Sequence, residues 1–116
     1  MRVRRILPDF EAPDPMAGAE FYSEVLGLEV VMDLGWVVTY AAPQNPSAQI
    51  NVMSEDASAP VVPAASIEVD DVDAAHDAAQ RLGAEIVHPL SDEAWGVRRF
   101  FVRDPNGRVL NVLTHR

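Results

Sequence analysis

The chain has 116 residues, with 18 acidic side chains against nine Lys plus Arg and a formal net charge of −9. This balance argues against nucleic acid as a partner, because binding to phosphates relies on clustered basic side chains. The sequence contains no cysteine, so neither disulfides nor thiolate metal sites can form. No apolar run approaches the roughly 20 residues that span a bilayer, and the basic amino terminus lacks the apolar stretch of a signal peptide. A cytoplasmic soluble protein is therefore predicted.

The first half is predicted to contain one strand, one helix and then three more strands. Residues 3–7 form a short strand, followed by an irregular stretch through Pro13. Asp14 can cap the helix, because its carboxylate can accept hydrogen bonds from free helix N–H groups. Apolar residues then recur at helical spacing and Gly27 suits the position after the helix; these residues are Ala17, Phe21 and Val25, with Tyr22 and Leu26 beside them. The three strands cover residues 28–32, 36–41 and 48–54, with turns at Gly35 and at residues 43–46.

The second half is predicted to repeat this order after a linker at residues 55–63, which is rich in Ala, Ser and Pro. A half-buried strand comes first, with Ile67 and Val69 on one face. Asp70 or Asp71 caps the next helix, which Gly83 ends. Its buried stripe is Val72, Ala75, Ala79 and Leu82. A strand at residues 85–88 and a hairpin at residues 94–113 complete the half.

The hairpin turns at Asp104-Pro105-Asn106-Gly107, a sequence suited to a tight turn. If these four residues form the loop, Arg103 pairs with Arg108, Phe100 faces Asn111 and Phe101 faces Leu110. Asn111 is then the one amide in an apolar row with Val109 and Leu113. Because burying an unpaired amide costs about 1–3 kcal/mol, Asn111 is expected to bond another polar group or a ligand.

The two halves also share sequence. Leu26-Gly27-Leu28-Glu29-Val30-Val31 matches residues 82–87 at an offset of 56 residues, since 82 − 26 = 56. Paired βαβββ modules, with Phe21-Tyr22 and Leu26-Gly27-Leu28 early and the Asp-Pro-Asn-Gly turn late, resemble the vicinal oxygen chelate superfamily. That is the group of glyoxalases, bleomycin-resistance proteins and extradiol dioxygenases. The resemblance covers the whole chain, residues 1–116, as one α+β domain. Module one is residues 1–54 and module two is residues 64–116. It implies a curved mixed sheet around a cleft, helices on its convex side, and a homodimer.

Catalytic members of that superfamily usually bind a metal through His on the first strand of a module and Glu or His on the last. The matching positions here are Leu7 (or Pro8) and Ala64 on the first strands, Asn111 on the last, and Gln49 or Asn51 on the fourth. Leu and Ala offer no donor, and neutral amides are poor ligands for divalent transition metals. The three histidines (His76, His88 and His115) do not show metal-ligand spacing. We therefore expect no metal, no cofactor and no catalytic residue.

What remains is an apolar and aromatic cleft with a few polar groups, as is typical of small-molecule sites. The predicted ligand-binding residues are Trp36, Tyr40, Asn51, Met53, Trp95, Arg98, Phe100 and Asn111. Three hypotheses stay open. The first is a metal-free binding protein of the bleomycin-resistance type that sequesters a cationic or aromatic antibiotic, which the acidic charge and aromatic side chains favour. The second is a glyoxalase-like lyase, isomerase or dioxygenase that uses a divalent metal. The third is a dimeric domain without a ligand.

Overall fold

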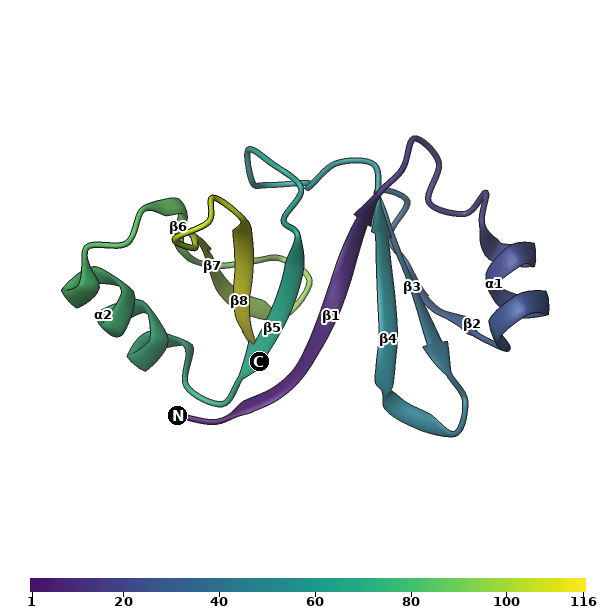
Figure 1. Cartoon of the computed structure of the whole chain (residues 1–116), viewed down its shortest axis with the longest axis horizontal. Helices are drawn as coiled ribbons and strands as arrows, with labels where there is room; N and C mark the ends of the chain where they lie inside the picture. Colours follow the sequence, from purple (N-terminus) through teal and green to yellow (C-terminus); the bar gives the residue numbers. More distant parts are fainter. The chain divides into compact units, whose positions relative to one another are not determined.

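A computed structural model describes all 116 residues and contains the predicted order of elements twice (Figure 1). The α+β class and the βαβββ modules are therefore confirmed. The elements are β1 (Val3–Glu11), α1 (Ala19–Leu26), β2 (Glu29–Asp33), β3 (Val37–Ala42), β4 (Asn45–Met53), β5 (Ala65–Val69), α2 (Val72–Leu82), β6 (Ile86–Asp92), β7 (Val97–Arg103) and β8 (Val109–His115). Neither helix is long and apolar enough to cross a membrane.

The chain separates into two compact units. We call Leu7–Val62 the first unit, and Met1–Ile6 together with Pro63–Arg116 the second unit. The division differs from the predicted module boundaries at the amino terminus, because the first six residues belong with the second half. Their contacts explain this: the Arg2 N–H donates to the Asp70 carboxylate at 2.8 Å, and Arg5 Nε donates to the Glu68 carboxylate at 2.6 Å.

In the first unit the strand order is β2-β3-β4-β1. β1 and β4 are parallel and the other neighbours antiparallel. A buried cluster of Leu28, Val38, Tyr40 and Val52 packs against Ala19 and Tyr22 of α1. The Tyr40 hydroxyl donates to the Pro15 carbonyl at 2.6 Å. Burial, and after it the neighbouring Tyr22, raises the pKa of Tyr40, so this hydroxyl remains a donor. The rings of Tyr22 and Tyr40 also lie 4.7 Å apart between centroids, and this aromatic pair helps to fix α1 to the sheet.

One prediction about α1 was wrong. Asp14 does not cap the helix: its carboxylate accepts from the Met16 N–H at 3.1 Å, which forms a turn, and the helix begins only at Ala19. The structure adds that the apolar residues at helical spacing lie on the outside of the helix, where Phe21, Val25 and Leu26 are 57–60% exposed. Tyr22 and Ala19 face the sheet instead. The predicted end at Gly27 is confirmed, with φ of 67°, in the left-handed region that glycine favours.

In the second unit the order is β5-β8-β7-β6, with β5 parallel to β8. Asp71 caps α2 by accepting from the Ala74 N–H at 3.0 Å, as predicted. Val69, Val72, Phe100 and Val112 form the core beneath the helix. This arrangement places Phe100 between the sheet and α2, where its ring contacts His76 at 4.9 Å between centroids.

The predicted register of the β7–β8 hairpin was wrong by one residue. Arg103 pairs with Val109, Phe101 with Asn111 and Phe100 with Val112. The loop has one residue more than predicted because the Asp104 carboxylate accepts from the N–H groups of both Asn106 and Arg108, at 2.8 and 2.9 Å. A one-residue shift moves every side chain of a strand to the other face. The residues of β7 that share a face with Asn111 are therefore Arg99 and Phe101, and not Arg98 and Phe100.

Candidate functional site

Each unit carries an asparagine on the sheet face opposite its helix, at equivalent positions. Asn51 of β4 lies between Asp9 of β1 and Thr39 of β3. Asn111 of β8 lies between Ser66 of β5 and Phe101 of β7. In each case the asparagine sits on the strand that pairs in parallel with the first strand of its module. The two asparagines therefore occupy the same place in the repeated fold, and their surroundings can be compared directly.

In the first unit the amide of Asn51 is bonded at both ends. Its Nδ2 donates to Asp9 Oδ1 at 2.8 Å, and its Oδ1 accepts from Thr39 Oγ1 at 2.6 Å. Asp9 and Thr39 are buried, at 6% and 5% exposure. A buried polar network is stable when every member finds a partner. Asn51 therefore has a structural role that the protein alone satisfies.

In the second unit the amide of Asn111 is bonded at one end only. Its Nδ2 donates to Ser66 Oγ at 3.0 Å, but its buried Oδ1 has no hydrogen-bond partner. Exchanging the two ends of the amide would satisfy Oδ1 at the expense of Nδ2, so one end lacks a protein partner in either orientation. The residue is only 8% exposed, where an unmade hydrogen bond costs about 1–3 kcal/mol. A buried polar atom that lacks a hydrogen-bond partner at this cost in free energy is unusual in a folded protein.

Beside Asn111 on the same face, Arg99 forms a buried ion pair that sequence analysis missed. Arg99 Nε donates to Glu93 Oε2 at 2.6 Å, and His88 Nε2 lies 3.2 Å from the same oxygen. The guanidinium also lies over the rings of Trp95 and Phe101, at 5.0 and 4.8 Å from their centroids. Arg98 and Arg99 are adjacent, and only the hairpin register decides which one faces this side.

A second ion pair on the second unit involves Glu68, which accepts from both Arg5 and His115. Desolvation opposes ionisation of this carboxyl. The hydrogen bonds from His115 and Arg5 outweigh it and hold the pKa of Glu68 below its ordinary value. Glu68 is therefore an ionised carboxylate bonded to Arg5 and His115, which does not suit it to donate a proton as a general acid.

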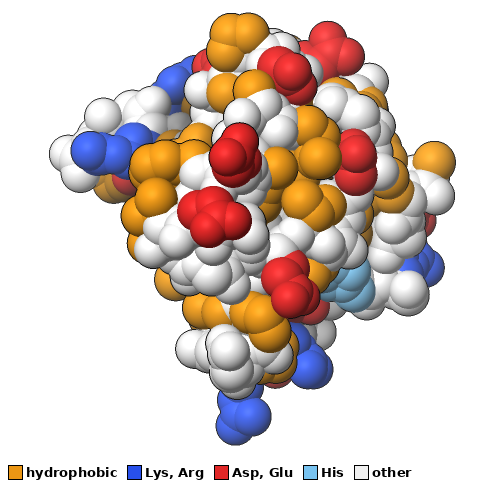
Figure 2. Space-filling view, turned by 90° about the vertical axis from the view of Figure 1, so that its right-hand side faces the viewer, with side chains coloured by type: hydrophobic (Ala, Val, Ile, Leu, Met, Phe, Trp, Pro, Cys, Tyr) orange, Lys and Arg blue, Asp and Glu red, His pale blue; other side chains and the backbone are white.

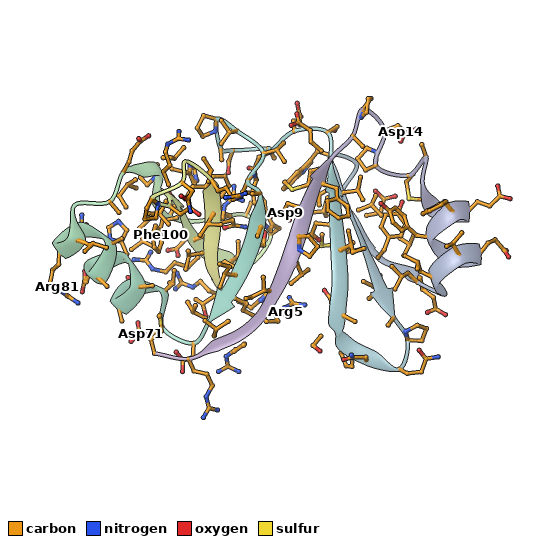
Figure 3. All side chains as sticks on the ribbon, viewed as in Figure 1. Arg5, Asp9, Asp14, Asp71, Arg81 and Phe100 are labelled. Carbon is orange, nitrogen blue, oxygen red and sulfur yellow. The ribbon has the colours of Figure 1, made fainter.

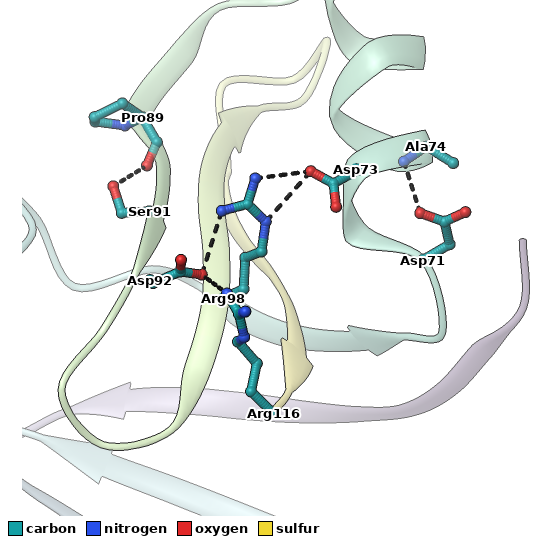
Figure 4. Close-up of polar contacts among 8 residues, drawn as sticks. All are labelled: Asp71, Asp73, Ala74, Pro89, Ser91, Asp92, Arg98 and Arg116. Carbon is teal, nitrogen blue, oxygen red and sulfur yellow. Dashed lines mark hydrogen bonds and ion pairs between the residues drawn. The ribbon is translucent and has the colours of Figure 1, made fainter.

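The structure contradicts the predicted placement of three ligand-binding residues. Tyr40 and Phe100 are 1% exposed in the two helix-side cores, so neither faces the predicted cleft. Figure 3 shows Phe100 on the α2 side of the second unit. Arg98 lies on the helix side too, where it pairs with Asp73 of α2 at 2.8 Å and with Asp92 at 3.2 Å (Figure 4). Its hydrogen bonds hold the pKa of Asp73 below the ordinary value.

The other predicted residues keep positions consistent with a site. Met53 and Asn51 share one face of β4, opposite Val37 and Thr39 of β3. Trp36 is half-buried just before β3, and Trp95 is half-buried above Arg99. Asn111 and Trp95 belong to the second unit, whereas Trp36, Asn51 and Met53 belong to the first.

Comparison with known proteins identifies the fold. The family model of the Glyoxalase/Bleomycin resistance protein/Dioxygenase superfamily matches residues 11–112. The chain belongs to this superfamily. No curated protein matches the sequence.

Solved glyoxalase-fold structures match almost the whole chain. An NAD-dependent benzaldehyde dehydrogenase from Legionella pneumophila has a TM-score of 0.75 at 16% identity, covering 96% of this chain and 99% of that one. A glyoxalase/bleomycin resistance protein/dioxygenase superfamily member from Vibrio splendidus has a TM-score of 0.71 at 16% identity, with 97% and 99% covered. Methylmalonyl-CoA epimerase from Mycobacterium tuberculosis has a TM-score of 0.74 at 18% identity, with 98% and 89% covered. At this identity the likeness extends to the fold alone, and the names differ in activity.

The donors of this chain do not fit the divalent metal that the superfamily implies. Leu7 and Ala64 have no side-chain donor. Both ends of the Asn51 amide are engaged, and the Oδ1 atom of Asn111 is the one buried side-chain oxygen without a hydrogen-bond partner in the protein. No three His, Cys, Asp or Glu side chains are grouped to hold a metal ion. One neutral amide oxygen is a poor ligand set for Zn, Ni or Fe.

The first unit also contains a cavity of about 490 Å³ beside the linker. None of the predicted ligand-binding residues lines it. Its walls are Glu11, Ser54, Glu55, Asp56, Ala59, Pro60, Val61 and Val62.

Proposed function

We propose that this glyoxalase-superfamily protein binds a small cationic or aromatic molecule without a metal ion, in the manner of a sequestering antibiotic-resistance protein. The ligand donates a hydrogen bond to Asn111 on the sheet face opposite α2. Trp95 is the aromatic side chain whose fluorescence is expected to change when the ligand binds.

The observation that supports this proposal most directly is the unpartnered amide oxygen of Asn111. The equivalent amide of Asn51 shows that the same fold can satisfy an asparagine at this position completely. The unpartnered oxygen of Asn111 can accept a hydrogen bond from a ligand. An N–H group of a cationic ligand can donate this bond, and its charge makes the bond stronger. The arrangement is consistent with a ligand-binding group kept ready at some cost in stability.

The charge distribution supports a cationic ligand. The first unit, Leu7–Val62, contains nine acidic residues and no Lys, Arg or His, whereas the second unit contains nine of each sign. The net charge of −9 thus belongs to the first unit and favours cations over anions around the chain as a whole, whereas the second unit, which carries Asn111 and Trp95, is balanced. The alternative, a lyase, isomerase or dioxygenase dependent on a divalent metal, would need donors that this chain does not offer at the matching positions.

Copper-free bleomycin and a monocationic aromatic dye serve as probes, with tryptophan fluorescence and thermal shift as readouts. We expect at least one of them to bind at micromolar concentration, to raise the unfolding temperature, and to bind at least ten times more weakly to Asn111→Leu. Leu82→Asp, an exposed change on α2, is the control and should bind normally. Retention of stoichiometric zinc, nickel or iron after dialysis, together with a loss of probe binding in EDTA, would refute the metal-free proposal.

A further inference from the structure

The residue opposite each asparagine differs between the two units. Thr39 of β3 is paired with Asn51 in the first unit, and Phe101 of β7 is paired with Asn111 in the second. Both pairs are antiparallel, and both asparagine strands also pair in parallel with the first strand of their module. Thr39 and Phe101 therefore occupy equivalent positions in the repeated fold, where one unit has a hydroxyl and the other a phenyl ring.

The hydroxyl of Thr39 completes the polar network of the first unit. Its Oγ1 donates to Asn51 Oδ1 at 2.6 Å. Residues that are directly opposite in an antiparallel pair have Cβ atoms about 4.5–5.5 Å apart, so a short polar side chain at this position reaches the amide. A phenyl ring has no N–H or O–H group to donate, and Asn111 Oδ1 has no partner. The ring of Phe101 thus accounts for the open oxygen.

Phe101 also engages the guanidinium on its own face of β7. Arg99 precedes it by two residues and therefore shares that face. The guanidinium lies over the Phe101 ring, 4.8 Å from the centroid, while its Nε donates to Glu93 at 2.6 Å. The Phe101 ring is 0% exposed and lies 5.3 Å from the ring of His88 between centroids. These contacts hold the ring in place, and none of the groups around it donates to the Asn111 oxygen.

Charge does not select the second unit. Carboxylates are exposed on the side of the first unit where α1 lies (Figure 2), and this unit contains no Lys, Arg or His. A cation would therefore be attracted to the first unit, yet the Asn51 amide is bonded at both ends there. The availability of the amide oxygen, which depends on the residue opposite it, is what distinguishes the second unit.

We propose that Phe101 is a positioning residue: it keeps the amide of Asn111 open, so that the second unit and not the first binds a ligand that forms a hydrogen bond. The proposal rests on the proposed function for the ligand, whereas the open amide can be tested without any ligand. Phe101 acts through Asn111 and does not itself have to touch the ligand. One position in the repeated fold then separates a closed structural module from an open binding module.

The matched variants Phe101→Thr and Phe101→Val test this role, because threonine and valine have nearly the same shape and leave the same space. Only threonine has a hydroxyl, which can donate to one end of the amide or accept from the other. Each variant is combined with Asn111→Leu, and urea unfolding gives the midpoint of all four proteins. We expect Asn111→Leu to raise the midpoint in the Phe101→Val protein and to lower it in the Phe101→Thr protein. The same direction of change in both backgrounds would overturn the proposal.

Ligand binding gives a second measurement, with copper-free bleomycin and the monocationic aromatic dye as probes. The Phe101→Thr protein should bind at least ten times more weakly than the Phe101→Val protein, and equal affinities would contradict the role of Phe101. A wild type that binds neither probe would count against the proposed function instead, and the urea midpoints would still decide on Phe101.

The converse change in the first unit guards against a fold defect at the buried Phe101. Thr39→Val removes the donor to Asn51 at nearly constant size. The fall in urea midpoint caused by Asn51→Leu should therefore be smaller in the Thr39→Val protein than in the wild type. An equal fall in both backgrounds would show that the residue opposite the asparagine does not decide whether the amide is satisfied, and the proposal would be wrong.

Discussion

The two equivalent asparagines allow the proposed role of Asn111 to be tested through stability alone. Leucine has the same branching as asparagine, so Asn51→Leu and Asn111→Leu each remove an amide without leaving a cavity. If Asn111 is held in the free protein with an unmade hydrogen bond, the two substitutions should change the free energy of unfolding in opposite directions.

The magnitudes follow from the contacts. Asn51→Leu removes the 2.8 Å bond to buried Asp9 and the 2.6 Å bond from buried Thr39. Because a buried carboxylate that loses a donor is costly, the free energy of unfolding should fall by about 2–4 kcal/mol. Asn111→Leu removes the 3.0 Å bond to Ser66, worth about 0.5–1.5 kcal/mol, but also removes an unpartnered oxygen that costs about 1–3 kcal/mol. The second variant should therefore be more stable than the wild type by about 1 kcal/mol.

Urea unfolding followed by circular dichroism measures both changes, and equal slopes would show that the denatured state is unaffected. For a chain of this length, 1 kcal/mol corresponds to about 3–6 °C in unfolding temperature. The reasoning is refuted if Asn111→Leu is destabilised as much as Asn51→Leu. In that case the free protein already satisfies Asn111 and does not hold its oxygen in readiness for a ligand.

Three other substitutions test separate parts of the structure. Gly107→Val should cost about 1 kcal/mol or more, measured by urea unfolding, because Gly107 has φ of 89°, where a β-branched residue is strained; the equivalent change at exposed Ala78 should cost less. Tyr40→Phe should cost about 1–2 kcal/mol, because the buried Pro15 carbonyl loses its 2.6 Å donor. Glu68→Gln should lower stability at pH 7, where the carboxylate is bonded to Arg5 and His115. Because the folded pKa of Glu68 lies below its ordinary 4.5, this difference should shrink as the pH falls below 4.5 and through the folded pKa; a difference that persists at pH 2 would contradict the assignment.

Features set by local chemistry were predictable from the sequence. The repeat is visible directly in the sequence. The two glycines that end the helices and the Asp71 cap each act on residues within a few positions along the chain. The structure confirms all of these features. The order of elements followed from these markers and from the alternation of apolar residues. The family could be inferred because its characteristic residues are spread over both modules in the right order.

The faces of the hairpin strands were not predictable, because they depend on one residue of loop length. The carboxylate of Asp104 closes a five-residue loop around Gly107 where four residues were expected, and the shift exchanges Arg98 for Arg99 beside Asn111. Sequence reasoning could place Asn111 but not its neighbours across the strand. The buried pair of Arg99 and Glu93 has no local signal at all, since its members come from different sides of a turn.

The orientation of α1 was missed for a different reason. A stripe of apolar residues at helical spacing indicates that one face avoids water, but it does not say whether the same chain or another covers it. α1 has two such faces, Tyr22 with Ala19 and Phe21 with Val25. Comparison with Asp77 and Arg81, which stand 56 residues after Phe21 and Val25 in the other module, distinguishes them, and this comparison needs only the repeat.

The placement of Met1–Ile6 has a consequence for synthesis on the ribosome. This segment is translated before its partners Glu68 and Asp70, which follow more than sixty residues later. At roughly 5–20 residues per second, its apolar side chains Val3 and Ile6 remain without these partners for about 3–13 seconds, during which the first unit is translated. A nascent chain stalled near residue 62 should therefore present Met1–Ile6 as a protease-sensitive segment next to a folded first unit, and the same segment should become resistant once β8 has been released.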